Sequence, residues 1–284
     1  MNFSEALEHI VDTACSKRLS LCVGSGISVG RPACRPLADE LKFCILEGIC
    51  SSVELRQLYE HRLRTEKDIG GKIRTYPLEA FIERISENYD ILGTIAEIFR
   101  GGSPNKNHII IARLLENGFV REILTTNFDL LLEKALVSIG WRIRDDFNVY
   151  CTEKQFREID FDSRLPTIFK IHGSADDQES IRVTLRLVAS QTLSESRARI
   201  LDRYLVSGEG DILILGYGAR DDFDINPVLS RLSSKKRVFY VRHESCEPIV
   251  TSELPEAFRN FEGNTIRCHT DEVVDYLWRA LLDE

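Results

Sequence analysis

Short apolar runs rich in β-branched residues recur along this chain, and they constrain its fold more than any other feature. Their hydrophobicity is continuous rather than alternating, which is typical of strands buried on both faces of a parallel sheet. Helical patterns separate the runs, so the sequence predicts an α/β fold: a Rossmann-like, doubly wound parallel sheet of about six strands. The predicted strands are LSLCV (19–23), EILTT (122–126), TIFKI (167–171), DILILG (211–216), RVFYV (237–241) and NTIRC (264–268).

The interval between the first two predicted strands, from about 31 to 120, holds several helical patterns and no convincing strand. It is much longer than a single crossover between parallel strands requires. We therefore expect a helical insertion after the first strand, packed on the sheet. No repeat or low-complexity linker divides the chain, so we expect residues 1–284 to form a single domain.

Composition and charge exclude several classes of protein. The chain is 43% hydrophobic with a formal net charge of -8, and it has no stripe of lysines and arginines. Direct nucleic-acid binding is therefore disfavoured, and a bound polyanion would be held locally by backbone amides. No apolar run approaches the roughly 18 residues of a membrane helix, and the N-terminus does not resemble a secretory signal, so we expect a cytoplasmic protein.

Eight cysteines occur in the chain, and none forms a C-x-x-C pair. Several lie in apolar runs, as buried thiols do, so we expect reduced, structural cysteines. The spacings contain no zinc module, and we expect no bound metal.

Four polar or glycine-rich segments follow successive predicted strands: GSGISVG (24–30), TTNFD (125–129), KIHGS (170–174) and GYGARDDFD (216–224). In an open α/β sheet, ligands bind beyond the carboxyl ends of the strands, so these segments are expected to meet at one site. The first segment departs from the dinucleotide fingerprint G-x-G-x-x-G, because its third glycine comes one residue late.

Each segment also has a purely structural interpretation. The first could be a tight turn without a ligand, and Asn127 and Asp129 could cap the helix predicted to begin at Phe128. His172 could be a core histidine, although its place at the end of a strand, before glycine and serine, favours a cleft. The aspartates of the fourth segment could be solvated caps.

Taken together, the four segments resemble the sirtuin (Sir2) superfamily, and most closely its bacterial Sir2-like, NAD-consuming branch. Sirtuins carry G-A-G-x-S followed by G-x-P-D-F-R, and this chain has GSGIS followed by GRPACR. TTNFD resembles the family's T-Q-N-x-D, and KIHGS resembles its strand ending in a catalytic His-Gly. GYGARDDFD is similar to the G-Y-x-x-x-D segment of the Sir2-like branch, which lies near the adenosine half of NAD.

The resemblance implies NAD+ as the bound substrate and assigns catalytic roles to Asn127 and His172. Asn127 would hydrogen-bond the nicotinamide ribose or the attacking water, and His172 would accept a proton from one of them. The first-loop amides and Arg35 would hold the pyrophosphate. The residues expected to contact NAD are Gly24, Ser25, Gly26, Ser28, Arg35, Asp129, Gly173, Gly216, Gly218 and Asp222.

Two departures from the family pattern bear on the expected activity. Ala33 and Cys34 stand at the family's Asp and Phe positions, and no cysteine lies between Gly173 and the next predicted strand, where sirtuins hold zinc. The resemblance therefore implies an NAD+ glycohydrolase that uses water as the nucleophile. The alternatives are an NAD-dependent protein deacylase or ADP-ribosyltransferase, and a non-catalytic subunit that senses NAD or ADP-ribose.

Members of the Sir2-like branch resemble effectors of bacterial antiphage defence that deplete NAD. Because the chain ends soon after its last predicted helix, we expect no fused sensor of any size. We therefore expect a separate regulatory subunit and assembly into oligomers.

Overall fold

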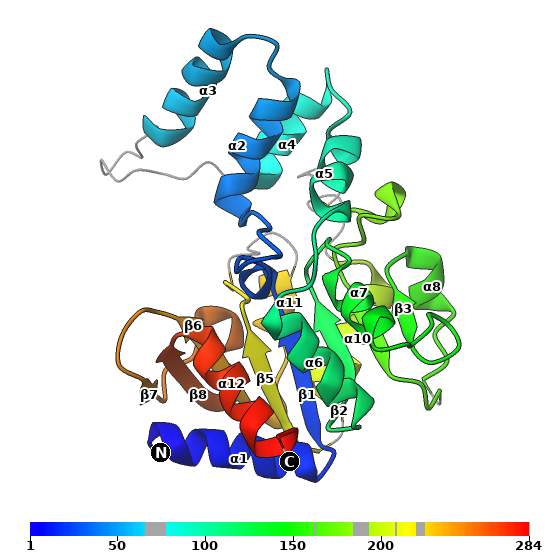
Figure 1. The fold of residues 1–284 in the computed structure, drawn as a ribbon, viewed down its shortest axis with the longest axis vertical. Coiled ribbons are helices and arrows are strands. Elements are labelled where there is room, and N and C mark those ends of the chain that lie inside the picture. The colour runs from blue at the N-terminus through cyan, green and yellow to red at the C-terminus, as the bar shows by residue number, and fades with distance from the viewer. Residues whose placement is uncertain (66–77, 162, 184–192, 208, 220–224, 284) are drawn as a thin grey trace.

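A computed structural model describes residues 1–283 except 66–77, 162, 184–192, 208 and 220–224 (Figure 1). Its centre is an eight-stranded sheet in the order β3-β4-β2-β1-β5-β6-β8-β7. All neighbouring strands run parallel except β7 and β8, which are antiparallel. The strands are β1 (Leu19–Val23), β2 (Val120–Thr125), β3 (Asn148–Tyr150), β4 (Thr167–Lys170), β5 (Asp211–Leu215), β6 (Ser234–His243), β7 (Ile249–Thr251) and β8 (Phe261–Cys268).

The doubly wound α/β fold is confirmed, with eight strands rather than about six. All six predicted strands form, and the two additional ones, β3 and β7, lie at the edges of the sheet. Each spans only three residues. A run of that length is too short for its hydrophobic pattern to distinguish a strand from a loop.

Helices cover both faces of the sheet, as the continuous hydrophobicity of its strands requires. One face packs against α1 (Phe3–Cys15), α6 (Lys106–Glu116), α7 (Leu131–Ser138) and α12 (Thr270–Leu281). The other packs against α8 (Glu153–Arg157), α10 (Glu195–Leu205), α11 (Ile225–Leu229) and the 3₁₀ turn η3 (Glu256–Phe258). Within β1, Leu21 and Cys22 belong to opposite cores, which shows how one short strand serves both layers.

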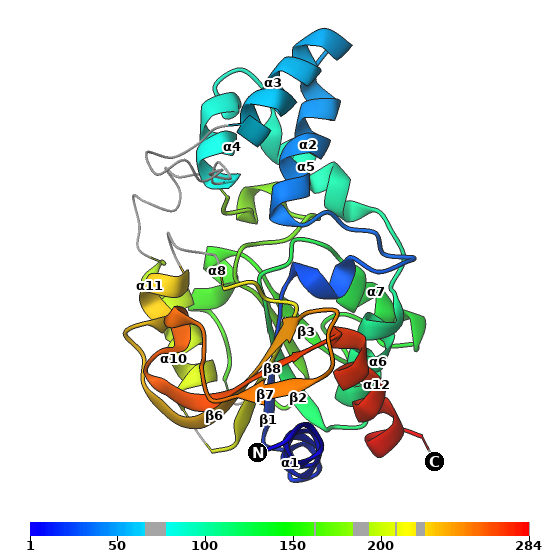
Figure 2. The same ribbon diagram turned by 90° about the vertical axis from the view of Figure 1, so that its left-hand side faces the viewer.

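The helical insertion after β1 is confirmed, but most of it does not pack on a face of the sheet. The helices α2 (Ala38–Ile49), α3 (Val53–Thr65), α4 (Leu78–Ser86) and α5 (Ile91–Arg100) form a lobe beyond the carboxyl ends of the strands (Figures 1 and 2). This insertion lobe has its own apolar core, which also takes in Phe128, Ala175 and Ile181 from the loops beneath it. The lobe therefore rests on the loops that carry the predicted site. Both chain ends lie at the opposite end of the molecule.

The strand order places a switch point at β1, whose neighbours are β2 on one side and β5 on the other. The connection after β1 leads to β2 on one side, and the connection after β5 leads to β6 on the other, so the two connections diverge. This is where ligands bind in doubly wound folds.

Candidate functional site

The loops that follow β1 and β5 meet backbone to backbone at the switch point. The amide of Gly24 donates to the carbonyl of Leu215 (2.9 Å), and the amide of Gly26 donates to that of Gly216 (2.9 Å). A Cβ on Gly24 would lie 2.6 Å from Gly216 O, and one on Gly26 would lie 2.8 Å from Gly216 Cα. These glycines therefore allow the two loops to touch, and their amides are already used within the protein.

The 3₁₀ turn η1 (Ser25–Ser28) follows, and its last residue is the centre of a buried polar network. The hydroxyl of Ser28 donates to Oδ2 of Asp129 (2.8 Å), and Nδ2 of Asn127 donates to the Ser28 oxygen (3.3 Å). Ser28, Asn127 and Asp129 are all buried. The network thus joins the β1 loop to the TTNFD segment, as the convergence of strand ends predicted.

The side-chain amide oxygen of Asn127 has no hydrogen-bond partner in this network. Its Oδ1 is buried, and no group in the described part of the chain hydrogen-bonds to it. Because a buried carbonyl oxygen without a partner is costly, such an atom is commonly completed by water or a ligand. Asn127 is therefore suited to accept a hydrogen bond from a ribose hydroxyl or from a water molecule.

Asp129 stabilises the start of the helix, as one interpretation of the sequence predicted, and it also bonds to Ser28. Its Oδ1 accepts from the amide of Leu131 (3.1 Å), the first residue of α7, while its Oδ2 accepts from Ser28. The helix begins three residues later than its predicted start at Phe128. Asp129 therefore stabilises the start of the helix and also takes part in the network.

His108 extends the network on the α6 side, and the sequence did not reveal it. Its Nε2 lies 3.1 Å from the Ser28 hydroxyl, and Asn105, the N-cap of α6, contacts its Nδ1. Burial lowers the pKa of His108 to about 4, while the nearby Asp129 carboxylate opposes that shift. His108 is thus neutral at physiological pH. The capping pattern at residues 105–108 was the only signal for it.

A buried ion pair supports the TTNFD segment from below. Nζ of Lys170, the last residue of β4, lies 2.7 Å from Oε1 of Glu133 and donates to the carbonyl of Asp129. Both side chains are almost fully buried. Burial raises the pKa of the Glu133 carboxyl, and the Lys170 ammonium opposes that rise. Lys170 thereby fixes the backbone of the segment that carries Asn127.

His172 and Gly173 follow β4 and lie against the same segment. The His172 ring stacks on Phe128 with 6.3 Å between ring centroids, and the side chain is 8% exposed. Gly173 has a φ of +94°, and a Cβ there would lie 2.3 Å from Ser180 O. Only glycine fits this tight turn, which holds His172 beside TTNFD.

Arg35 is used within the protein. Its Nε donates to the carbonyl of Ala33 (2.8 Å), and its Nη1 donates to the carbonyl of Ile98 in α5. The guanidinium therefore ties the loop after η1 to the insertion lobe, a role that the sequence did not suggest.

The remaining predicted residues lie around the β1 and β5 loops. Ser25 opens η1, Gly216 has a φ of +65°, and Gly218 is exposed. Asp222 lies outside the described residues.

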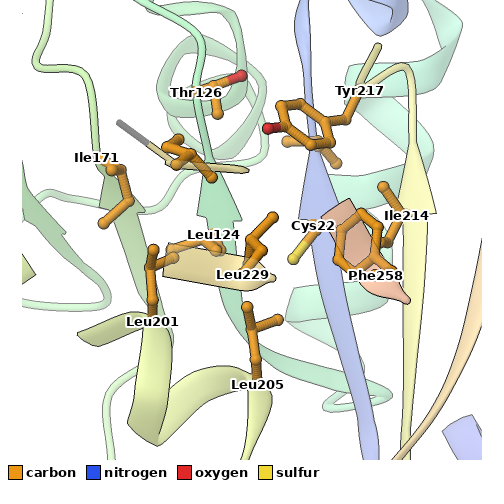
Figure 3. Close-up of a pocket in the computed structure, with 12 residues that line it drawn as sticks. Cys22, Leu124, Thr126, Ile171, Leu201, Leu205, Ile214, Tyr217, Leu229 and Phe258 are labelled. Atoms are coloured by element: carbon orange, nitrogen blue, oxygen red, sulfur yellow. The ribbon is translucent and has the colours of Figure 1, made fainter. Parts of the chain in front are cut away.

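A small apolar cavity of about 30 Å³ lies beneath these loops, on the α10 side of the sheet (Figure 3). Thr126 and Tyr217 stand at its upper end, next to the tips of β2 and β5, and Leu205 of α10 closes its lower end. The polar network and the apolar cavity thus flank the switch point from opposite faces of the sheet.

Two further observations concern metal sites and membrane helices in the described part of the chain. No three His, Cys, Asp or Glu side chains there are grouped so that they could hold a metal ion. Among its helices, none has the length and apolarity to cross a membrane.

Comparison with known proteins identifies a SIR2-like domain over residues 121–257, a range that contains Asn127, His172 and Gly216. One similar solved structure, titled as the structural basis for the mechanism and regulation of Sir2 enzymes, is 12% identical. The alignment covers 97% of this chain and 96% of that chain, with a TM-score of 0.43. A crystal structure of a Sir2 homolog in complex with NAD is 13% identical, with 98% and 94% covered and a TM-score of 0.48. No curated protein matches the sequence.

Proposed function

We propose that this chain, whose residues 121–257 match a SIR2-like domain, is a member of the Sir2 superfamily and an NAD+ glycohydrolase that cleaves NAD+ to nicotinamide and ADP-ribose. The observation that carries the proposal is the buried Ser28, Asn127 and Asp129 network, in which Asn127 presents an open carbonyl oxygen at the switch point. This is a fixed polar group at the place where a doubly wound fold binds its ligand.

The reaction does not require the protein to protonate the leaving group. Nicotinamide is joined to its ribose as a pyridinium, so it leaves as a neutral molecule when the glycosidic bond breaks. The oxygen of a water molecule forms the new bond to the ribose carbon and releases one proton. The site has to hold the ribose, position that water and accept the proton.

In this proposal, Asn127 Oδ1 accepts a hydrogen bond from the attacking water or from a ribose hydroxyl. Ser28 fixes the amide group by accepting from Nδ2, so Oδ1 is held in one direction. Asp129 and His108 in turn hold Ser28 in place. Because these polar groups are already oriented, they do not have to reorganise when the transition state forms. His172 accepts the released proton, a role usually worth about 10²–10⁴ in rate.

The pyrophosphate would lie at the loop after β1, near Ser25. Because Gly24 and Gly26 donate their amides to the carbonyls of Leu215 and Gly216, the amides of these two glycines are not part of the proposal. Arg35 would assist through its charge from the loop after η1, where it is tied to α5.

The decisive experiment measures nicotinamide release from NAD+ by the purified chain without any peptide. Asn127→Ala should lower the rate by about 10² or more, because it removes a positioning group from the site. Asn264→Ala is the matched control, since Asn264 is half-buried on β8 and donates to Thr251 O. If both variants release nicotinamide as fast as the unchanged chain, the proposed site is wrong.

A non-catalytic sensing subunit is the second candidate, because the network could hold NAD+ without cleaving it. Tight binding of intact NAD+, weakened by Asn127→Ala and accompanied by no release, would favour this function. Release that depends on an added acylated peptide would instead favour deacylation.

We further propose that the activity serves antiphage defence and is controlled by a separate protein subunit within an oligomer. An uncontrolled NAD+ hydrolase would deplete its own cell, so activation by a partner is expected. Full activity of the isolated chain at cellular NAD+ concentration, unchanged by any co-purifying protein, would contradict this proposal.

A further inference from the structure

A second hollow surface lies at the end of the sheet where the parallel strands begin, opposite the loops that follow their carboxyl ends. Its main cavity has a volume of about 470 Å³, within the range of small-molecule sites. Five cationic side chains line it: Lys17, Arg18, Arg121, Arg164 and Arg203. They come from the turn before β1, the start of β2, the loop before β4 and α10. We call the surface the amino-edge groove.

The cations of the groove are only weakly neutralised by the protein. Glu122 and Glu209 are the acidic side chains among its lining residues, and Arg18 lies 3.6 Å from the exposed Glu209. Within the described part of the chain, Lys17, Arg121, Arg164 and Arg203 form no salt bridge. Although the protein has a net charge of -8, cationic side chains therefore outnumber acidic ones by five to two around this cavity.

Two of the guanidinium groups are held in place by the fold. Arg203 lies 4.2 Å from the centre of the Phe161 ring and donates to the carbonyl of that residue (3.1 Å). Arg121 donates to the carbonyl of Arg164 (3.2 Å). Because an arginine has five N–H donors, each retains donors for another acceptor. Fixed guanidinium forks are well suited to phosphate oxygens.

An adjoining cavity of about 530 Å³ gives the groove a second chemical character. It shares Lys17, Arg121 and Arg164 with the first, and its wall includes Trp141 and Pro166. Glu116, Asp145 and Asp146 also line it. Glu116 pairs with Arg113, and both aspartates pair with Arg142. An aromatic face can stack on a base, and carboxylates can accept hydrogen bonds from sugar hydroxyls.

We propose that the amino-edge groove binds a nucleoside di- or triphosphate, with the phosphates among the cations and the nucleoside against Trp141. The adjacency of the two cavities favours a ligand with a polyanionic end and a planar end. This site is independent of the proposed NAD+ chemistry, because it lies at the amino ends of the strands and the NAD+ site lies at their carboxyl ends.

The test measures binding of ATP and of pyrophosphate to the full chain by calorimetry, without divalent metal. ATP should bind, should compete with pyrophosphate and should bind more weakly as salt rises. The double variant Lys17→Gln/Arg164→Gln should weaken ATP binding about tenfold or more, because it removes two charge-assisted contacts. The control Arg242→Gln/Arg259→Gln removes the same charge from residues that line neither cavity, and it should leave binding unchanged.

A second readout places the nucleoside. ATP should change the fluorescence of Trp141, and Trp141→Phe should remove that change while Trp278 remains as an internal reference. Lys17 and Arg164 are exposed, so the double variant is expected to fold, and the two single variants Lys17→Gln and Arg164→Gln repeat the ATP-binding measurement.

Three results would overturn the inference. The first is no ATP binding at low salt. The second is binding that the double variant leaves intact, whether or not Asn127→Ala abolishes it, because the nucleotide would then lie elsewhere. The third is equal weakening by the control, which would indicate a general effect of net charge.

Discussion

Ser28 and Asp129 lie in different loops, 101 positions apart in the chain, yet the Ser28 hydroxyl donates to the Asp129 carboxylate over 2.8 Å. This bond connects the carboxyl end of β1 with that of β2. It also leaves the Ser28 oxygen free to accept from Asn127. The geometry of the candidate site therefore depends on one hydroxyl.

Ser28→Ala should destabilise the fold by about 1.5–3 kcal/mol, because the buried carboxylate of Asp129 loses a charge-assisted hydrogen bond. Denaturant unfolding measures the loss. The control is Ser138→Ala, which removes a hydroxyl from the exposed end of α7 and should change stability by at most about 0.5 kcal/mol. Equal effects of the two substitutions would show that the bond contributes little.

His108 should make stability depend on pH. Burial lowers its pKa to about 4 from the ordinary 6.5, so the unfolded chain binds a proton at a pH where the native chain does not. Stability from this group is therefore complete above about pH 6.5 and is lost as the pH falls towards 4, by roughly 3 kcal/mol in total. Denaturant unfolding at several pH values between 4.5 and 7 gives the free energy of unfolding as a function of pH. This free energy should depend less steeply on pH for His108→Gln than for the unchanged chain. Identical slopes would contradict the assignment.

Lys170→Met should cost about 3–5 kcal/mol, because it leaves the buried Glu133 carboxylate without its ion partner. Thermal or denaturant unfolding measures the cost. Arg259→Met breaks the exposed pair with Glu256 and should cost at most about 1 kcal/mol. The double variant Lys170→Met/Glu133→Leu should recover part of the loss, and no recovery would mean that Lys170 acts mainly through its backbone contacts.

Gly216→Ala should be more damaging than Gly118→Ala, although both glycines have similar positive φ angles of +65° and +73°. Each substitution places a residue with a Cβ in the left-handed backbone conformation, which costs about 1–2 kcal/mol of folding free energy. A Cβ at Gly216 would also lie 2.5 Å from Ile27 N, whereas one at Gly118 meets nothing within 4 Å. Unfolding measurements should therefore separate the two variants, and equal losses would contradict the close packing of the β1 and β5 loops.

Thiol labelling of the native chain should distinguish three buried cysteines from three exposed ones. Burial raises the pKa of Cys22 to about 12, of Cys151 to about 11 and of Cys268 to about 12, so these thiols should react slowly. The exposed thiols should react first, and they are Cys15, Cys34 and Cys246. Mass spectrometry after brief alkylation identifies the labelled positions, and early labelling of Cys22 would contradict the buried core around β1.

Local sequence predicted the six main strands and the residues at their carboxyl ends. Each of those strands is long enough for its apolar pattern to be recognised, whereas β3 and β7 are not. The convergence of Ser28, Asn127 and Asp129 was also predictable, because parallel strands bring their carboxyl ends to one edge. The sequence did not show that the glycine amides are used within the protein or that Arg35 bonds to α5.

The sequence by itself determined which segments form the sheet, and hence where a ligand site would lie, because hydrophobic periodicity and glycine spacing are properties of neighbouring residues. Only the tertiary structure decided the partners of the site. The contacts of Ser28 with His108 and of Lys170 with Glu133 join residues 80 and 37 positions apart. No local pattern records such pairs, since their energies depend on burial and distance, which exist only after the chain has folded.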